Sequence, residues 1–211
     1  MQVNLTGLGK RYNYEWIFRK LTYTFDSGTS YAILGHNGSG KSTLLTIMAG
    51  HNLASEGHLA YTSGGRSIPQ DEVYRQLTLT APYLELVEEF TLLEMLDFHT
   101  RFKPLRHKLT NAALIDRMGL QRSRNKFVKD FSSGMKQRLK LGLAIYSNSS
   151  LLLLDEPTTN LDQEGVAWYQ EHVAQNKEGR LIIVGSNIQH EYSFCDQQLR
   201  ISDYHVVPRA R

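Results

Sequence analysis

The sequence predicts an α/β fold with a parallel-sheet core, an N-terminal antiparallel β layer and an α-helical subdomain. Three observations lead to this prediction. The first residues alternate between apolar and polar side chains, a glycine-rich segment joins a short apolar strand to a helix, and two apolar runs near the end are separated by another helix. Strands that alternate with helices form a parallel sheet with right-handed crossovers.

Two half-buried strands are expected at the start of the chain. Val3 and Leu5 alternate with polar residues, and so do Leu21, Tyr23 and Phe25. This period of two residues indicates strands with one face on a core and the other in water. An antiparallel β layer therefore opens the fold.

The next elements surround the glycine-rich segment. Residues 31–34 form a short apolar run, and apolar residues recur at helical spacing over 41–48, with Gly50 as the expected stop. Short strands are also expected over 57–62 and 77–80, around a turn that contains two adjacent glycines, Gly64 and Gly65.

The middle of the chain has a helical pattern, which we interpret as an α-helical subdomain over about 85–147 within a single domain of residues 1–211. After it we expect a buried strand over 151–154 and a helix over 163–176. Another buried strand over 181–185 and a terminal strand over 199–207 complete the predicted sheet.

Composition excludes several classes of protein. With 41% hydrophobic residues and 24 basic against 21 acidic side chains, the chain is too apolar for disorder. A lone cysteine, Cys195, rules out an internal disulfide or a cysteine metal cluster. There is no run of about 20 apolar residues and no secretory signal, so a cytoplasmic location is expected. A net charge of +3 without long basic runs gives no reason to expect nucleic-acid binding.

The glycine-rich segment matches the phosphate-binding loop of P-loop NTPases: glycine, four residues, glycine, lysine and serine. Glycines let backbone N–H groups approach phosphate oxygens, and a helix N-terminus favours anions. Lys41 is expected at the terminal phosphates, and the Ser42 hydroxyl at Mg²⁺. The expected nucleotide-binding residues here are Gly35, His36, Asn37, Gly38, Ser39, Gly40, Lys41, Ser42 and Thr43.

Two acidic residues follow the apolar strand over 151–154. Ligands of open α/β sheets bind at the carboxyl ends of strands, so Asp155 is expected beside the phosphates as a Mg²⁺ anchor. Glu156 is the candidate general base for an attacking water. A third motif begins at Ser132, a good N-cap, where Gly134 leaves the first helical turn open to an anion.

Together the three motifs resemble the nucleotide-binding subunit of ATP-binding-cassette (ABC) transporters over nearly the whole chain. The resemblance implies an ATPase that uses ATP and Mg²⁺ and works as a homodimer or heterodimer. The signature residues Ser132, Ser133 and Gly134 would contact ATP held by the opposite subunit, and Asp162 would lie at the subunit interface. Closure of the dimer would drive a membrane permease at the inner face of the cell membrane.

The resemblance also implies an aromatic residue against adenine, for which Tyr12 is the match and Trp16 the rival. Three motifs depart from the family pattern. The signature has Ser133 and Met135 where glycine and glutamine are usual, and Tyr83 stands where a glutamine is expected, with Glu85 as another candidate for its role.

The third departure lies at the switch histidine, which falls on Asn187, an amide that can donate a hydrogen bond but cannot become cationic. His190, three residues on, is interpreted as an exposed residue at a helix start. The expected catalytic residues are Glu156, Lys41 and Asn187.

These features predict the ATP-hydrolysing subunit of an ABC transporter, and the short chain suggests the haem-exporter type of cytochrome c maturation. Two alternatives remain: a soluble ABC-type ATPase that acts on ribosomes or nucleic acid, and a regulatory nucleotide-binding module with weak hydrolysis.

Overall fold

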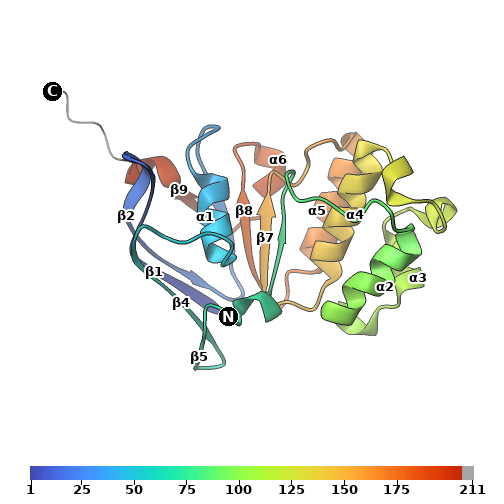
Figure 1. The fold of residues 1–211 in the computed structure, drawn as a ribbon, viewed down its shortest axis with the longest axis horizontal. Helices are drawn as coiled ribbons and strands as arrows, with labels where there is room; N and C mark the ends of the chain where they lie inside the picture. Colours follow the sequence, from blue (N-terminus) through green and yellow to red (C-terminus); the bar gives the residue numbers. More distant parts are fainter. Residues whose placement is uncertain (206–211) are drawn as a thin grey trace.

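Two sheets form the framework of the protein in a computed structural model, which describes residues 1–205 (Figure 1). The antiparallel sheet has the strand order β2-β1-β4-β5. Its strands are β1 (Gln2–Tyr12), β2 (Glu15–Asp26), β4 (Glu56–Ser63) and β5 (Arg66–Ile68). Val3 faces Phe25 and Leu5 faces Tyr23 across β1 and β2, so the alternating residues pair as their pattern predicts.

The second sheet is parallel throughout, with the strand order β6-β7-β8-β3-β9. Its strands are β3 (Ser30–Leu34), β6 (Leu77–Thr80), β7 (Leu151–Asp155), β8 (Leu181–Gly185) and β9 (Gln197–Arg200). This parallel core, the antiparallel layer and the helical subdomain confirm the predicted fold class.

The helices are α1 (Lys41–Met48), α2 (Leu92–Phe102), α3 (Asn111–Arg117), α4 (Ser133–Tyr146), α5 (Gln163–Gln175) and α6 (Gln189–Tyr192). In the described part of the chain, 3₁₀ turns η1 to η5 lie at Val73–Arg75, Arg106–Lys108, Gln121–Ser123, Val128–Asp130 and Ile201–Tyr204. Within residues 1–205, none of the helices combines the length and the apolar character that crossing a bilayer requires.

The strands β7 and β8 each contribute to two cores, one on each face of the parallel sheet. Leu151 and Leu153 of β7 pack with α1 and the antiparallel sheet, whereas Leu152 and Leu154 pack with α4 and the rest of the helical subdomain. The uniform apolar run of β7 is therefore explained by the burial of this strand on both faces. As a result, α1 and α4 lie on opposite faces of the sheet (Figure 1).

A buried arginine fixes the C-terminal end of α4. Arg180, which is 2% exposed, donates to the carbonyl oxygens of Ala144, Ile145, Ser147 and Ser149. Burial lowers the pKa of Arg180 to about 9. A cation at this end satisfies helical carbonyls that have no partner in the helix and complements the helix dipole.

Two expectations need correction. The paired glycines Gly64 and Gly65 turn the chain from β4 into β5, a strand that the sequence pattern does not predict, while β6 joins the parallel sheet. The terminal strand runs over 197–200 and gives way to a 3₁₀ turn, and residues 206 and 207 lie outside the described part of the chain.

Candidate functional site

The phosphate-binding pattern lies where the sequence places it, between β3 and α1. Gly40, directly before the helix, has φ 97°, and a Cβ there would lie 2.6 Å from Cγ2 of Ile17. Only glycine fits both the conformation and the space. Lys41 is buried, and its ammonium donates to the carbonyl oxygens of Gly35 (2.8 Å) and His36 (3.2 Å). The loop therefore closes around the lysine side chain.

Asp155 ends β7 as a buried carboxylate, and its Oδ1 atom has no hydrogen-bond partner among the described residues. Burial raises the pKa of Asp155 to about 6, and the neighbouring Ser42 hydroxyl acts in the opposite direction. Gly185 keeps this corner open, since a Cβ there would lie 3.1 Å from Oδ1 of Asp155. The Asp155 carboxylate and the Ser42 hydroxyl provide oxygen ligands of the kind that a small hard cation such as Mg²⁺ prefers.

Glu156 follows with a left-handed backbone, at φ 42°. This conformation costs a non-glycine residue roughly 1–2 kcal/mol, and the N–H of Glu156 bonds to the Gly185 carbonyl at 3.0 Å. The bond ties the residue after β7 to the end of the adjacent strand β8. Glu156 is thereby held at the sheet edge beside Asp155.

The loop after β6 brings Tyr83 to the same corner. Burial and the nearby charge of Asp155 raise the pKa of the Tyr83 hydroxyl to about 12, although half of the side chain is exposed. Lys140 of α4 holds this loop by donating to the carbonyl oxygens of Ala81, Pro82 and Leu84, at 3.1 to 3.4 Å. Of the two candidates for the missing glutamine, Tyr83 is the one that lies beside Asp155.

Asn187 follows β8 and is exposed, and it lines a hollow of about 270 Å³ together with Gly35 and Arg200. The histidine nearby takes another role. Nε2 of His190 lies 3.1 Å from the Thr158 hydroxyl, so this side chain is attached to the loop after β7.

A larger hollow of about 710 Å³ adjoins the other side of the phosphate loop. It is lined by Tyr14, Glu15, Trp16, Ile17, His36, Gly38 and His205. Tyr12 is not among them, because its hydroxyl accepts a hydrogen bond from Nδ2 of Asn52 (2.9 Å) and its ring lies under the Lys10 ammonium. The structure therefore brings Trp16, and not Tyr12, next to His36 and Gly38.

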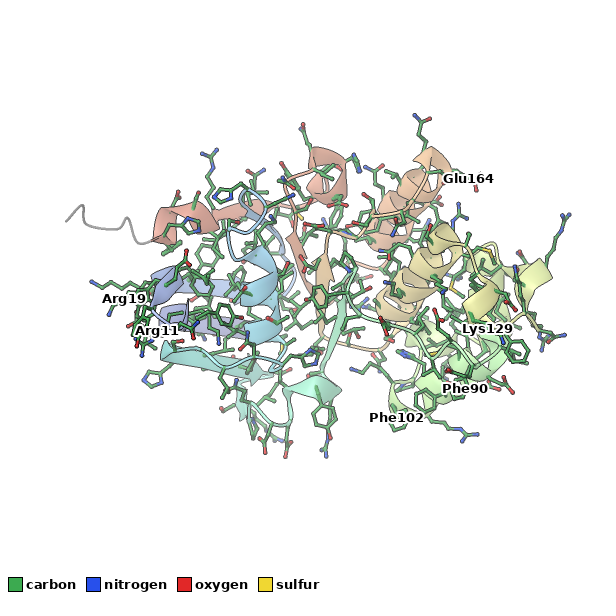
Figure 2. The ribbon with its side chains drawn as sticks, turned by 45° about the horizontal axis from the view of Figure 1, so that its top comes forward. Arg11, Arg19, Phe90, Phe102, Lys129 and Glu164 are labelled. Atoms are coloured by element: carbon green, nitrogen blue, oxygen red, sulfur yellow. The ribbon has the colours of Figure 1, made fainter. Side chains whose placement is uncertain are left out.

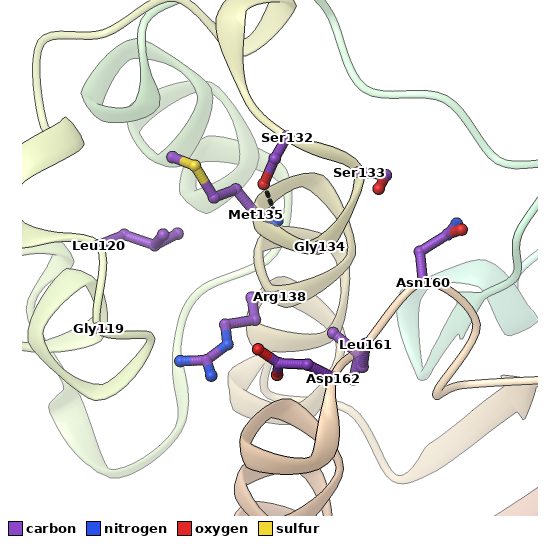
Figure 3. Close-up of a pocket in the computed structure, with 10 residues that line it drawn as sticks. All are labelled: Gly119, Leu120, Ser132, Ser133, Gly134, Met135, Arg138, Asn160, Leu161 and Asp162. Carbon is purple, nitrogen blue, oxygen red and sulfur yellow. Dashed lines mark hydrogen bonds between the residues drawn. The ribbon is translucent and has the colours of Figure 1, made fainter.

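A second surface assembles the signature residues. The Ser132 hydroxyl accepts from the Met135 N–H (3.2 Å) and caps α4, as predicted. This helix start, Asn160 and Asp162 line one hollow of about 390 Å³. Figure 3 shows these residues around it. Asp162 caps α5 by accepting from the Gly165 N–H (2.8 Å). The signature and the segment before α5, distant in sequence, form one surface.

Sequence reasoning missed Lys140, which belongs to no binding pattern. Its partners are carbonyl oxygens, so no complementary side chain signals the contact in the sequence. The helix that begins at the signature contains Lys140, but only the fold shows which loop this side chain reaches.

Comparison with known proteins gives a consistent set of matches. The family model described as ABC transporter matches residues 18–159. The uncharacterized ABC transporter ATP-binding protein YybJ of Bacillus subtilis (strain 168) is 31% identical, with 95% of this chain and 92% of YybJ covered. The lantibiotic transport ATP-binding protein SrtF of Streptococcus pyogenes is 30% identical, with coverages of 88% and 80%.

Among solved structures, the present chain is similar to a chain of the ATP-binding cassette MJ0796, with a TM-score of 0.81. That structure is a dimer in a post-hydrolysis state with ADP and Pi bound. The present chain and the MJ0796 chain are 21% identical, and 94% of each is covered. At this identity the likeness concerns the fold.

Proposed function

The chain belongs to the ABC transporter family, and from this premise we propose that it pairs with a second ATP-binding subunit around ATP to drive a membrane permease. It is an ATPase and the motor subunit of an ABC transporter, in keeping with the family match and its ATP-binding relatives. The pairing, the roles of individual residues and the permease surface are the content of the proposal.

One observation supports the pairing of two ATP-binding subunits. The phosphate loop starts α1 on one face of the parallel sheet, and the signature starts α4 on the other face. Each helix start suits an anion, but the sheet lies between them. Two copies arranged head to tail would bring the loop of one chain to Ser132 and Gly134 of its partner, with Asp162 at the interface.

The residues divide the chemistry as follows. Lys41 and the loop amides hold the phosphates, while Ser42 and Asp155 hold Mg²⁺, which neutralises phosphate charge when bound. Glu156 orients the attacking water as general base. Asn187 donates a hydrogen bond to the terminal phosphate without titrating. Trp16, beside the loop, is the better-placed aromatic residue for adenine than Tyr12.

The helical subdomain offers the surface for the permease. Phe90, Phe98 and Phe102 form a row of ring contacts, with centroids 5.5 and 5.1 Å apart. Phe102 is 74% exposed, and Figure 2 shows it and Phe90 on the side of the helical subdomain, away from Arg11 and Arg19. Exposed apolar groups of this kind mark interaction sites.

An acidic edge lies next to this row. It consists of Glu85, Glu88 and Glu89, of which Glu88 pairs with Lys136 of α4. Such a surface fits a permease segment that carries apolar and basic side chains. The protein would then lie at the inner face of the cell membrane through its partner.

The transported substrate stays open. SrtF is named for lantibiotic transport, and YybJ is uncharacterized. Neither name supports the haem-exporter subtype, so we do not carry it further.

The test uses Glu156→Gln, which should bind Mg-ATP without hydrolysing it. We expect this variant, trapped with Mg-ATP in detergent-solubilised cells, to copurify with a multi-span membrane protein. Lys41→Ala is the matched control and should capture nothing, because it cannot hold the phosphates. Capture of ribosomes or nucleic acid alone would support the soluble-ATPase alternative. Wild-type hydrolysis by Glu156→Gln would remove Glu156 as the base.

A further inference from the structure

Glu191 is a fully buried carboxylate that the proposed mechanism does not use. It lies on the short helix α6 and has no exposed surface. Oε1 accepts from the Thr158 N–H (2.8 Å) and the Thr158 hydroxyl (2.5 Å), and Oε2 accepts from the Ser186 hydroxyl. Three donors thus converge on one side chain, and none is a lysine or an arginine.

The donors come from two loops that flank the expected position of the terminal phosphate. Thr158 lies two residues beyond Glu156, in the loop that continues to Asp162. Ser186 directly precedes Asn187 in the loop after β8. A single carboxylate therefore bridges the loop with the candidate base and the loop with the candidate phosphate donor.

Further contacts hold Glu191 itself in place. Its carbonyl accepts from the buried Tyr169 hydroxyl (2.8 Å), and the Ser186 hydroxyl also accepts from the Ile188 N–H (2.9 Å). The Thr158 hydroxyl gives its one proton to Glu191, so Nε2 of His190 must be the donor in their contact. The network leaves the carboxylate one geometry.

We propose that Glu191 is a positioning residue for ATP hydrolysis, which fixes the separation between Glu156 and Asn187 by binding Thr158 and Ser186 at once. This inference rests on the proposed function of those two residues. Buried hydrogen bonds to a charged group are among the stronger ones in proteins. Without the carboxylate the two loops can shift relative to each other, and a displacement of about 1 Å from productive geometry can lower a rate by about 100-fold.

The test compares Glu191→Gln with Glu171→Gln, a control on the exposed side of α5. We expect Glu191→Gln to lower kcat for ATP hydrolysis about 10- to 100-fold, with KM and the affinity for a fluorescent ATP analogue within about twofold. Glu171→Gln should leave all three unchanged. A purely structural role would instead lower nucleotide affinity and kcat together.

Thr158 supplies a second measurement that does not depend on the folding of Glu191→Gln. Thr158→Ser keeps both donors and should keep kcat, whereas Thr158→Val loses the hydroxyl and should lower it. The double variant Thr158→Val/Glu191→Gln should be no slower than the slower single variant, because both changes break one contact.

Wild-type kcat in Glu191→Gln or in Thr158→Val would overturn the proposal, and so would a parallel loss of nucleotide affinity. Glu156→Gln, measured under the same conditions, distinguishes a failure of the proposed role of Glu156 from a failure of the proposed role of Glu191. If Glu156→Gln hydrolyses ATP normally, the proposed function of Glu156 fails; if it is inactive while Glu191→Gln is normal, only the role of Glu191 fails.

Discussion

The phosphate loop and the loops that flank it differ in how closely they follow the family pattern. Residues 35–43 match the phosphate-binding pattern, whereas the flanking loops carry Tyr83 and Asn187 in place of glutamine and histidine. In the proposed function the first region contributes backbone N–H groups as well as Lys41 and Ser42, whereas the second contributes side chains alone. Backbone geometry demands particular residues, while a side-chain function tolerates another residue that reaches the same place.

The phosphate loop and the flanking loops also differ in the contacts that hold them in place. Gly40 is fixed by its left-handed conformation, and Lys41 by its bonds to carbonyl oxygens of the loop itself. The flanking loops are fixed from outside, by Lys140 of α4 and by Glu191 of α6. The comparison predicts that substitutions in the phosphate loop abolish function, whereas substitutions at Tyr83 only reduce it.

The largest expected effect comes from Lys41→Ala. Removal of a preorganised cation at the phosphates should lower ATP hydrolysis by at least about 100-fold and abolish ATP binding at micromolar concentrations. Phosphate release and nucleotide titration of the purified protein measure both. Lys126→Ala, in an exposed turn of the helical subdomain, is the control. Hydrolysis within a few-fold of wild type would remove the phosphate loop from the site.

Asp155→Asn should abolish ATP hydrolysis while it stabilises the folded protein at pH 7. The folded state raises the pKa of Asp155 from 3.8 to about 6 by burial. The ionised form therefore opposes folding above pH 6, by about 3 kcal/mol for a shift of roughly two pH units. The neutral amide should stabilise the protein at pH 7 by about that amount, while hydrolysis is lost with the Mg²⁺ ligand.

Thermal unfolding without nucleotide checks this prediction. The difference in stability between Asp155→Asn and wild type should disappear as the pH falls below about 4, because the carboxyl is then neutral in both states. A variant that is less stable than wild type at pH 7 would show that the carboxylate has favourable partners in the folded protein.

Trp16→Ala and Tyr12→Ala sharpen the comparison at the edge of the phosphate loop. Loss of base stacking costs about 1–3 kcal/mol, so Trp16→Ala should weaken ATP binding about tenfold. Tyr12→Ala should leave ATP affinity within about twofold, because it loses only the contacts of Tyr12 with Asn52 and Lys10. Titration with ATP and with inorganic triphosphate tests whether the difference depends on the base. The reverse order of effects would restore Tyr12 as the adenine contact.

The smallest effect is expected for Tyr83→Phe. The hydroxyl lies beside Asp155 and is half exposed, and a typical hydrogen bond contributes about 0.5–1.5 kcal/mol, so hydrolysis should fall about two- to tenfold. The Mg²⁺ concentration for half-maximal activity should rise in parallel. Tyr83→Gln, which restores the family residue, should retain activity. An unchanged Mg²⁺ dependence in Tyr83→Phe would place the hydroxyl outside the site.

The sequence predicts those features whose cause is local. Gly40 before α1, the Ser132 cap and the uniform apolar run of β7 each report a conformation or a burial pattern within a few residues. The sequence does not predict features that depend on contacts between residues far apart in the chain. The partnership of Tyr12 with Asn52 spans 40 residues, and Glu191 belongs to no motif. Both become visible only when the fold brings the partners together.

The same reason explains the element that was missed and the one that was misplaced. The strand β5 has three residues, too few to show an alternating pattern. Leu77–Thr80 was expected near the glycine turn but pairs with β7 instead, some 70 residues away in sequence. Strand order in a parallel sheet depends on such long-range pairing.

Lys140 and Arg180 share a property that bears on how this chain can evolve. Both attach the helix α4 through main-chain oxygens, which every residue type provides. These bonds therefore place no demand on the side chains of the accepting residues, whereas they require the two cations. In a saturation mutagenesis library selected for transport, the half-buried positions 82 and 84 should accept more residue types than positions 140 and 180. This freedom lets the loop after β6 keep its place while carrying an unusual tyrosine.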